Sequence, residues 1–240
     1  MRKTVVVGGV TVGYRDAGEP GGAPVVLLHG GSSSAATWDR LTGRLRGRGL
    51  RTIAVDLRGH GDSSRTPTYP LTGYRDDVLG LLDRLGLERV ALVGHSLGAY
   101  TALLVAQQAP ERVVRLVLEE PPMPTREAAE AHGLNRARFL LPAIGILATR
   151  RRADAKAVIA AVRQLREPDP QWWTRLERIT APTLVISGGP GSHIAPERLR
   201  QLVAALPDAA FATVPVGHRI HRRAPAPFEE LVIPFLSDVR

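Results

Sequence analysis

A serine between two glycines, in the turn formed by residues 94–98 (GHSLG), is the strongest candidate for chemistry in this sequence. A serine hydroxyl is a weak nucleophile on its own, so a protein that uses it must present it sharply and pair it with a base. The turn follows the apolar run 89–93 and precedes the apolar stretch 97–109, which predict a buried strand and a helix. Small flanking residues leave room for a strained turn that holds Ser96 out at the edge of a sheet. We therefore predict that Ser96 is a nucleophile.

The elements that must position this serine follow from the alternation of short apolar runs with amphipathic stretches. The runs predict strands at 5–7, 10–14, 24–28, 51–55, 89–93, 113–118, 183–187 and 210–214, and helices at about 38–48, 72–85, 97–109, 196–205 and 227–236. Such alternation is typical of the α/β class, in which a mostly parallel, doubly wound sheet carries helices on both faces. The first two runs predict a hairpin.

The alternation stops between residues 121 and 180, where a helical pattern with prolines and arginines replaces it. We predict a core domain from residues 1–120 and 181–240, with 121–180 as a helical cap insertion over the active site. Ordinary packing helices are the alternative interpretation. Trp172 and Trp173 suit packing better than a substrate pocket. Arg136 and Arg138 could recognise a substrate carboxylate, although a solvated helix face is the preferred interpretation.

The composition excludes several classes of protein. The chain has 240 residues and no cysteine, so thiolate catalysis, disulfide scaffolds and cysteine-ligated metal sites are ruled out. The net charge of +9 is almost all arginine, because Lys3 and Lys156 are the only lysines. These arginines are scattered, and aromatic residues make up only 5% of the chain, so nucleic acid is not the expected partner.

Neither a secretory leader nor a membrane span is expected. The N-terminal apolar segment is too short and strand-like for a signal peptide, and no stretch approaches the ~18 apolar residues that cross a bilayer. We expect a cytoplasmic protein that binds a small-molecule acyl substrate and no membrane, while the oligomeric state stays open.

Four motifs resemble the α/β-hydrolase family in order and spacing over essentially the whole chain. They are, in chain order, Leu28-His29-Gly30-Gly31, Asp56-Leu57-Arg58-Gly59-His60-Gly61, the turn around Ser96, and Gly217-His218. The resemblance implies that His218, between a strand and the last helix, is the base, with His221 as its local rival. It also implies an oxyanion hole formed by the backbone N–H groups of Gly31 and Leu97, although a plain turn would also explain Gly30-Gly31.

The acid is where the sequence departs from the commonest family pattern, which places an aspartate in the loop after strand 183–187. That loop, 188–194, contains no carboxylate. Some members, including a group of haloalkane dehalogenases, carry the acid at the end of the preceding strand instead. If positions are counted from this strand as in those relatives, the resemblance implies that Glu120 is the acid. Glu119 is the alternative acid. Successive strand residues point to opposite faces, so only one of them should face His218.

Other polar residues near these motifs have simpler interpretations. A solvent-exposed strand end would account for Glu119 and Glu120 without catalysis. Asp56 and Asp62 suit turns that are closed by side-chain to backbone hydrogen bonds. Of the remaining motif histidines, His95 is interpreted as shaping the serine turn, and His29 and His60 as anchors of their loops.

Together with the resemblance, these residues predict hydrolysis of an ester-like acyl bond through Ser96, His218 and Glu120, by way of an acyl-enzyme and without a metal or organic cofactor. Haloalkane dehalogenase and epoxide hydrolase chemistry is set aside, because those enzymes use an aspartate nucleophile where Ser96 stands. Lactonase, thioesterase, amidase, carbon–carbon hydrolase and perhydrolase chemistry remain alternatives. A noncatalytic small-ligand receptor on the same fold is a further alternative.

Overall fold

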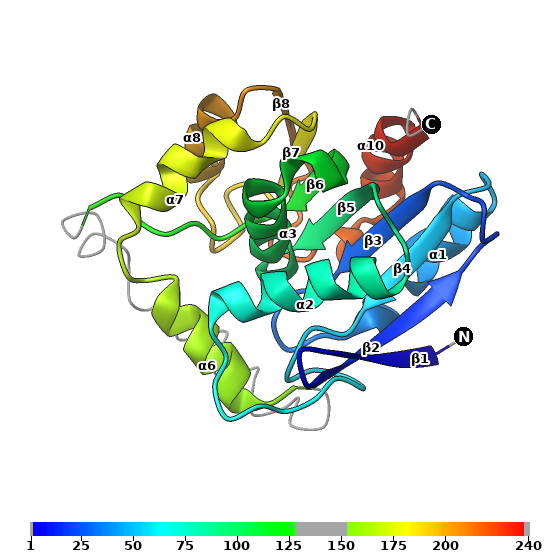
Figure 1. Ribbon diagram of the computed structural model, residues 1–240. Coiled ribbons are helices and arrows are strands. Elements are labelled where there is room, and N and C mark those ends of the chain that lie inside the picture. Colours follow the sequence, from blue (N-terminus) through cyan, green and yellow to red (C-terminus); the bar gives the residue numbers. More distant parts are fainter. Residues whose placement is uncertain (1, 128–152, 238–240) are drawn as a thin grey trace.

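The computed structural model describes residues 2–127 and 153–237. Its centre is an eight-stranded sheet in the order β1-β2-β4-β3-β5-β6-β7-β8 (Figure 1). The strands are β1 (Arg2–Val7), β2 (Val10–Ala17), β3 (Pro24–Leu28), β4 (Arg51–Val55), β5 (Val90–His95), β6 (Val113–Glu119), β7 (Thr183–Ser187) and β8 (Ala209–Thr213). The first two form the predicted hairpin and pair antiparallel, and β3 to β8 pair parallel. The α/β class and the mostly parallel sheet are confirmed.

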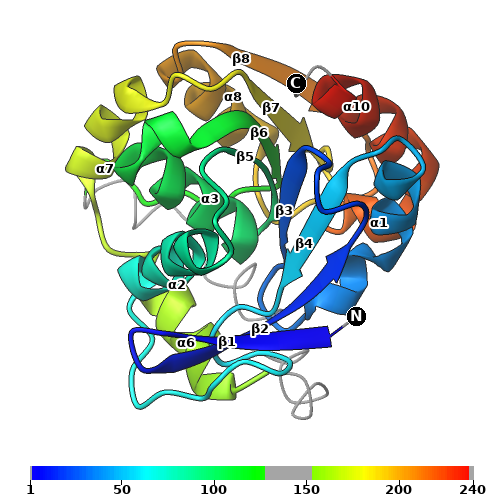
Figure 2. The same ribbon diagram turned by 45° about the vertical axis from the view of Figure 1, so that its right-hand side comes forward.

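Helices cover both faces of the sheet, as the alternation predicts (Figure 2). One face carries α2 (Leu71–Arg84), α3 (Leu97–Gln108) and α8 (Pro196–Ala205), and the other carries α1 (Asp39–Arg46) and α10 (Pro225–Ser237). The strands β3 to β7 are almost wholly buried, because a parallel sheet covered on both faces leaves neither face to water. The described residues also contain three short 3₁₀ helices, η1 (Ala35–Trp38), η2 (Pro110–Arg112) and η3 (Arg175–Arg178).

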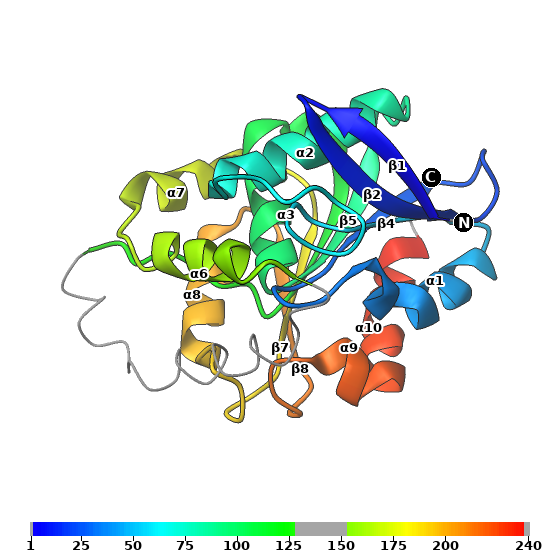
Figure 3. The ribbon, with the colours of Figure 1, turned by 90° about the horizontal axis from the view of Figure 1, so that it is seen from below.

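The described part of segment 121–180 holds α6 (Ala155–Gln164) and α7 (Pro170–Thr174). Figure 3 shows α6 beside α2. Asp154 caps α6 and accepts a hydrogen bond from the Tyr69 hydroxyl at 2.7 Å, and the Gln164 amide donates to the Tyr69 carbonyl at 2.8 Å. Residues 128–152, including Arg136 and Arg138, lie outside the described residues.

The two tryptophans of this segment pack against the core. Trp172 is fully buried and stacks on Tyr100 of α3, with ring centroids 5.7 Å apart. Trp173 donates from Nε1 to the carbonyl oxygen of Pro124 at 3.1 Å. Their contacts therefore agree with the packing interpretation. Among the described residues, no helix is both long and apolar enough to cross a membrane.

Candidate active site

Ser96 occupies a strained turn between β5 and α3. Its backbone has φ 50° and ψ −116°, a conformation that costs a non-glycine residue about 1–3 kcal/mol. A Cβ at Gly98 would collide with the carbonyl oxygen of Leu28, and one at Gly94 would lie 2.5 Å from Cα of Ala99. Within residues 90–107, all of them described, Ser96 is the single residue that is not buried. The turn thus exposes one hydroxyl at the end of a buried strand.

The loop after β3 lies beside this turn and is held by hydrogen bonds from the loop after β4. The His29 imidazole accepts from the N–H of Leu57 at 3.0 Å, and the His60 imidazole accepts from the N–H of Ser32 at 3.3 Å. The Asp56 carboxylate accepts from the N–H groups of Ala35 and Asp62. Asp56, His29 and His60 therefore hold the loops, as predicted.

Glycines 30 and 31 bring this loop close to the serine turn and to α6. A Cβ at Gly30 would lie 2.6 Å from Nδ1 of His95, so only glycine fits there. A Cβ at Gly31 would lie in ordinary contact, 3.6 Å from a methyl group of Val158. The backbone at Gly31 consequently faces the first turns of α6, and Val158 lies over it.

His218 and Glu120, which are 98 residues apart in sequence, lie in contact. Nδ1 of His218 is 3.2 Å from Oε2 of Glu120 and donates to it, while the His218 side chain keeps 18% of its surface exposed. Glu120 is fully buried, one residue beyond β6, with a φ of 52°. Its carboxylate also accepts from the N–H of Gly188 at 2.5 Å and from the hydroxyl of Ser192. Three donors thus surround the acid.

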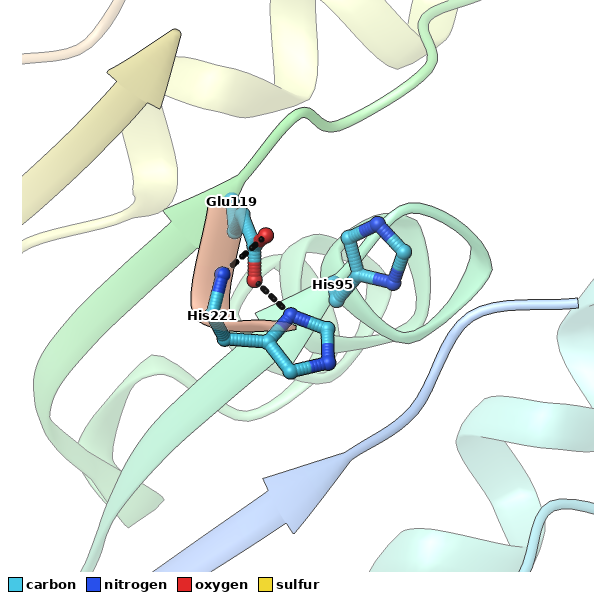
Figure 4. A group of neighbouring side chains, drawn as sticks. All are labelled: His95, Glu119 and His221. Atoms are coloured by element: carbon cyan, nitrogen blue, oxygen red, sulfur yellow. Dashed lines mark hydrogen bonds and ion pairs between the residues drawn. The ribbon is translucent and has the colours of Figure 1, made fainter. Parts of the chain in front are cut away.

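Glu119 makes a second carboxylate–imidazole pair. Its Oε2 lies 2.6 Å from Nδ1 of His221, and its Oε1 accepts the His221 backbone N–H at 3.0 Å (Figure 4). Glu119 is also fully buried, so the two glutamates do not simply end the strand in solvent. Burial without hydrogen-bond donors would be costly, and each carboxylate finds its own histidine as a donor. The two adjacent carboxylates thus meet different histidines.

Burial controls the pKa values in this cluster. It raises the pKa of Glu119 to about 7 and that of Glu120 above its usual range, where the N–H of Gly188 and the Ser192 hydroxyl oppose the rise. Burial, followed by the charges of Arg222 and Arg219, lowers the pKa of His221 to about 3. Burial, His193 and Arg219 hold the pKa of His218 well below its ordinary value. The His218 imidazole is therefore neutral at pH 7 and able to accept a proton.

Two further histidines flank His218. His95 donates from Nε2 to the carbonyl oxygen of His218 at 2.8 Å, and its ring centroid is 4.8 Å from that of His218. The ring of His193, from the loop after β7, lies 3.8 Å away, centroid to centroid. His95 therefore holds the backbone of the His218 loop against the serine turn, which extends the predicted role of His95 in shaping that turn.

His95, Glu119 and His221 are the one group among the described residues whose ligand atoms are close enough to hold a metal ion, all within 4.8 Å of one another (Figure 4). Two imidazoles and a carboxylate are ligands that zinc accepts. However, both oxygens of Glu119 are already bonded to His221, and Nε2 of His95 is bonded to His218. These hydrogen bonds to groups of the protein already occupy the ligand atoms that a metal ion would need.

The sequence-based interpretation missed Ser192, His193 and the short helix α9 (Ile220–Arg223) that carries His221. Ser192 stands in the loop that carries the acid in the commonest pattern, and it contributes a donor to Glu120 in place of a carboxylate. A hydroxyl in that loop was a usable signal. His193 gave none, because its position beside His218 depends on how the loops after β7 and β8 pack together.

A twisted parallel sheet with a strained serine turn after a central strand, a histidine loop near the last helix and a buried acid define an α/β hydrolase fold. The chain belongs to the alpha/beta hydrolase family, whose profile matches residues 25–231. It is 30% identical over 250 residues to the sn-1-specific diacylglycerol lipase ABHD11 of Mus musculus. The alignment covers 89% of this chain and 80% of the relative.

Two other proteins are similar along nearly their whole length. A 2-hydroxy-6-oxononadienedioate/2-hydroxy-6-oxononatrienedioate hydrolase of Pseudomonas putida is 29% identical, with 93% of this chain and 91% of the relative covered. The crystal structure of a hydrolase from Pseudomonas aeruginosa matches with a TM-score of 0.83 and 26% identity, covering 98% of each chain. The fold and the family are thus shared with hydrolases of different substrates.

Proposed function

We propose that this protein is a serine hydrolase that cleaves an ester-like acyl bond of a small molecule, with Ser96 as nucleophile, His218 as base and Glu120 as the orienting acid. The observation that carries the proposal is the 3.2 Å contact between the His218 imidazole and the buried Glu120 carboxylate, in a loop held against the serine turn by His95. A neutral imidazole with Nδ1–H directed at a carboxylate leaves Nε2 free to accept the serine proton.

The rival pair, Glu119 and His221, is less suited to act as acid and base. His221 is buried, its Nδ1 is bonded to Glu119, and its Nε2 lies 2.8 Å from the hydroxyl of Thr37. Both ring nitrogens are therefore occupied. His218 keeps part of its ring exposed, so substrate can approach it.

The reaction would proceed in two halves. Ser96 Oγ attacks the acyl carbonyl, its proton passes to Nε2 of His218, and the oxyanion forms toward the backbone N–H groups of Gly31 and Leu97. The proton then goes from His218 to the leaving oxygen, which departs and leaves an acyl-enzyme. Water attacks this ester with His218 again as base, and the released carboxylic acid regenerates Ser96. Glu120 stabilises the imidazolium in both halves.

Residues 121–180 would act as the cap that selects the substrate. Support comes from α6, whose residue Val158 lies over Gly31, and from the hydrogen bonds that tie α6 to Tyr69. The relatives named above act on a diacylglycerol and on a dienedioate, so the family resemblance supports hydrolysis and leaves the acyl group to be measured.

A fluorophosphonate probe tests the proposal directly. We expect rapid covalent labelling of the folded wild-type protein and none of Ser96→Ala, because only a hydroxyl activated by a base attacks phosphorus at a useful rate. A panel of p-nitrophenyl esters from acetate to decanoate, a diacylglycerol, a lactone and 2-hydroxy-6-oxononadienedioate then identifies the bond cleaved. Absence of labelling, or equal labelling of both proteins, would contradict the hydrolase and favour a noncatalytic receptor.

A further inference from the structure

Glu119 connects the serine turn to the loop that carries His218. Its backbone carbonyl accepts the N–H of Ser96 at 2.9 Å, so the end of β6 fixes the backbone of the nucleophile. Its carboxylate binds His221 twice, through the backbone N–H at 3.0 Å and through Nδ1 at 2.6 Å (Figure 4). One residue thereby contacts both segments that the reaction must align.

His221 transmits this contact to His218. It lies three residues beyond His218, in α9, and Nε2 of its ring is bonded to the hydroxyl of Thr37 in η1. His95 holds the same loop from the other side by its 2.8 Å bond to the carbonyl oxygen of His218. The loop is thus fixed at His218 by its backbone and at His221 by both backbone and ring.

A buried carboxylate–imidazole pair is a costly way to fill space, since apolar residues of the same volume often give equal or greater stability. Polar pairs of this kind are retained in some proteins because their directional bonds specify one arrangement. Here the arrangement specified is the contact of the His218 ring with Glu120, in a loop bonded to the residue before Ser96. Small displacements matter in such a site, because an error of 1 Å can cost about 100-fold in rate.

We propose that Glu119 and His221 are positioning residues, which set His218 against Glu120 and Ser96 without contacting substrate. The inference rests on the proposed function for its kinetic consequences, but the placement of His218 can be measured apart from activity. The positioning role gives a purpose to the second carboxylate–imidazole pair, which takes no part in the proposed reaction steps.

The kinetic test compares Glu119→Ala, Glu119→Gln, His221→Ala and His221→Asn on the best ester of the panel. We expect kcat to fall about 100-fold in the alanine variants while KM stays within about 2-fold, because the ring is displaced and the substrate contacts are kept. Glutamine and asparagine retain part of the hydrogen bonding and should recover part of kcat. Glu229→Gln is the matched control, since Glu229 is also buried and is bonded to Arg40 outside this cluster.

A double-mutant cycle separates positioning from general stability. In a His218→Ala background the Glu119→Ala change should cost nothing further, because the group it positions is gone. If the double variant lost kcat by the full product of the two single-variant losses, that result would overturn the inference. So would a folded Glu119→Ala protein whose kcat stays within about 2-fold of wild type.

The low-field proton NMR signal of the His218 Nδ1–H, identified by its loss in His218→Ala, gives a readout without turnover. We expect it in the wild type and expect it broadened or shifted in Glu119→Gln, which keeps the shape of the side chain. An unchanged signal would contradict the positioning role even in an active enzyme. A changed signal in a protein that the fluorophosphonate does not label would support the positioning role while the hydrolase proposal fails.

Discussion

Ser192 donates its hydroxyl hydrogen bond to Oε2 of Glu120, the same oxygen that faces Nδ1 of His218. The loop after β7 therefore supplies hydrogen-bond donors to an acid that projects from the end of β6. The N–H of Gly188, from the same loop, bonds the other carboxylate oxygen at 2.5 Å. These bonds hold the carboxylate in one orientation and favour its ionised form against the effect of burial.

The first prediction concerns the acid itself. Glu120→Gln should lower kcat by about 100-fold or more, because an amide neither stabilises the imidazolium nor selects the tautomer with Nδ1–H. Steady-state kinetics on the best ester measures the loss. Glu229→Gln provides the same chemical change in a buried side chain outside the site and should leave kcat unchanged. Retention of full activity in folded Glu120→Gln would contradict the assignment.

A second prediction uses the proximity of Ser192 to move the acid. Glu120→Ala should be nearly inactive, and adding Ser192→Asp should restore at least about 10-fold of the lost kcat, since the new carboxylate starts from a side chain already in contact with the old one. Glu120→Ala with Ser192→Asn is the control for shape without charge. The idea is wrong if the aspartate and asparagine double variants are equally inactive.

The third prediction is a pH dependence. His218 must be neutral to accept a proton, so kcat/KM falls as the pH drops through its pKa, which burial and then His193 hold down. His193→Asn removes an imidazole whose protonated form would repel a protonated His218, so it should raise the pKa of His218 and move the acidic limb to higher pH. Arg89→Gln, an exposed change before β5, should not move it. A shift to lower pH in His193→Asn would contradict this account.

Two glycines give a matched stability prediction. A Cβ at Gly98 collides with the carbonyl oxygen of Leu28, whereas nothing lies within 4 Å of a Cβ at Gly43, which is exposed in α1. Gly98→Ala should lower the free energy of unfolding by more than about 2 kcal/mol. Gly43→Ala should raise it by about 0.5–1 kcal/mol, the helix preference of alanine over glycine. Denaturant titration of both variants measures the two changes in the free energy of unfolding. Equal changes would contradict the close packing at the serine turn.

The last prediction concerns the acyl group. Val158 is buried over Gly31, whereas its neighbour Ile159 is 59% exposed. Val158→Ala should open space beside the proposed oxyanion loop and raise kcat/KM for longer acyl chains by about 4-fold per methylene newly accommodated, from ~0.8 kcal/mol each. Ile159→Ala should leave the chain-length profile unchanged. If both variants give the same profile as wild type, Val158 does not limit the acyl site.

Much of the core could be predicted from sequence because its signals are local. The apolar runs at 24–28, 51–55 and 183–187 are the strands β3, β4 and β7 residue for residue, since strands buried on both faces have continuous apolar sequences. Helix α8 likewise begins at Pro196 and ends at Ala205 as predicted, because proline favours the first turn of a helix. The serine turn was also visible because its five residues are contiguous in the sequence, although Gly98 packs against Leu28 of the neighbouring strand β3.

The pairing of acids with histidines is what only the tertiary structure decided. Strand alternation predicts that Glu119 and Glu120 diverge, but which of them meets His218 depends on the loops after β7 and β8, about 70 to 100 residues further along the chain. The same packing makes His221 a buried, doubly bonded group and leaves His218 open to substrate. Sequence determined the strands and the exposed serine, because those follow from near neighbours. The roles of two adjacent glutamates follow from which loop each one meets.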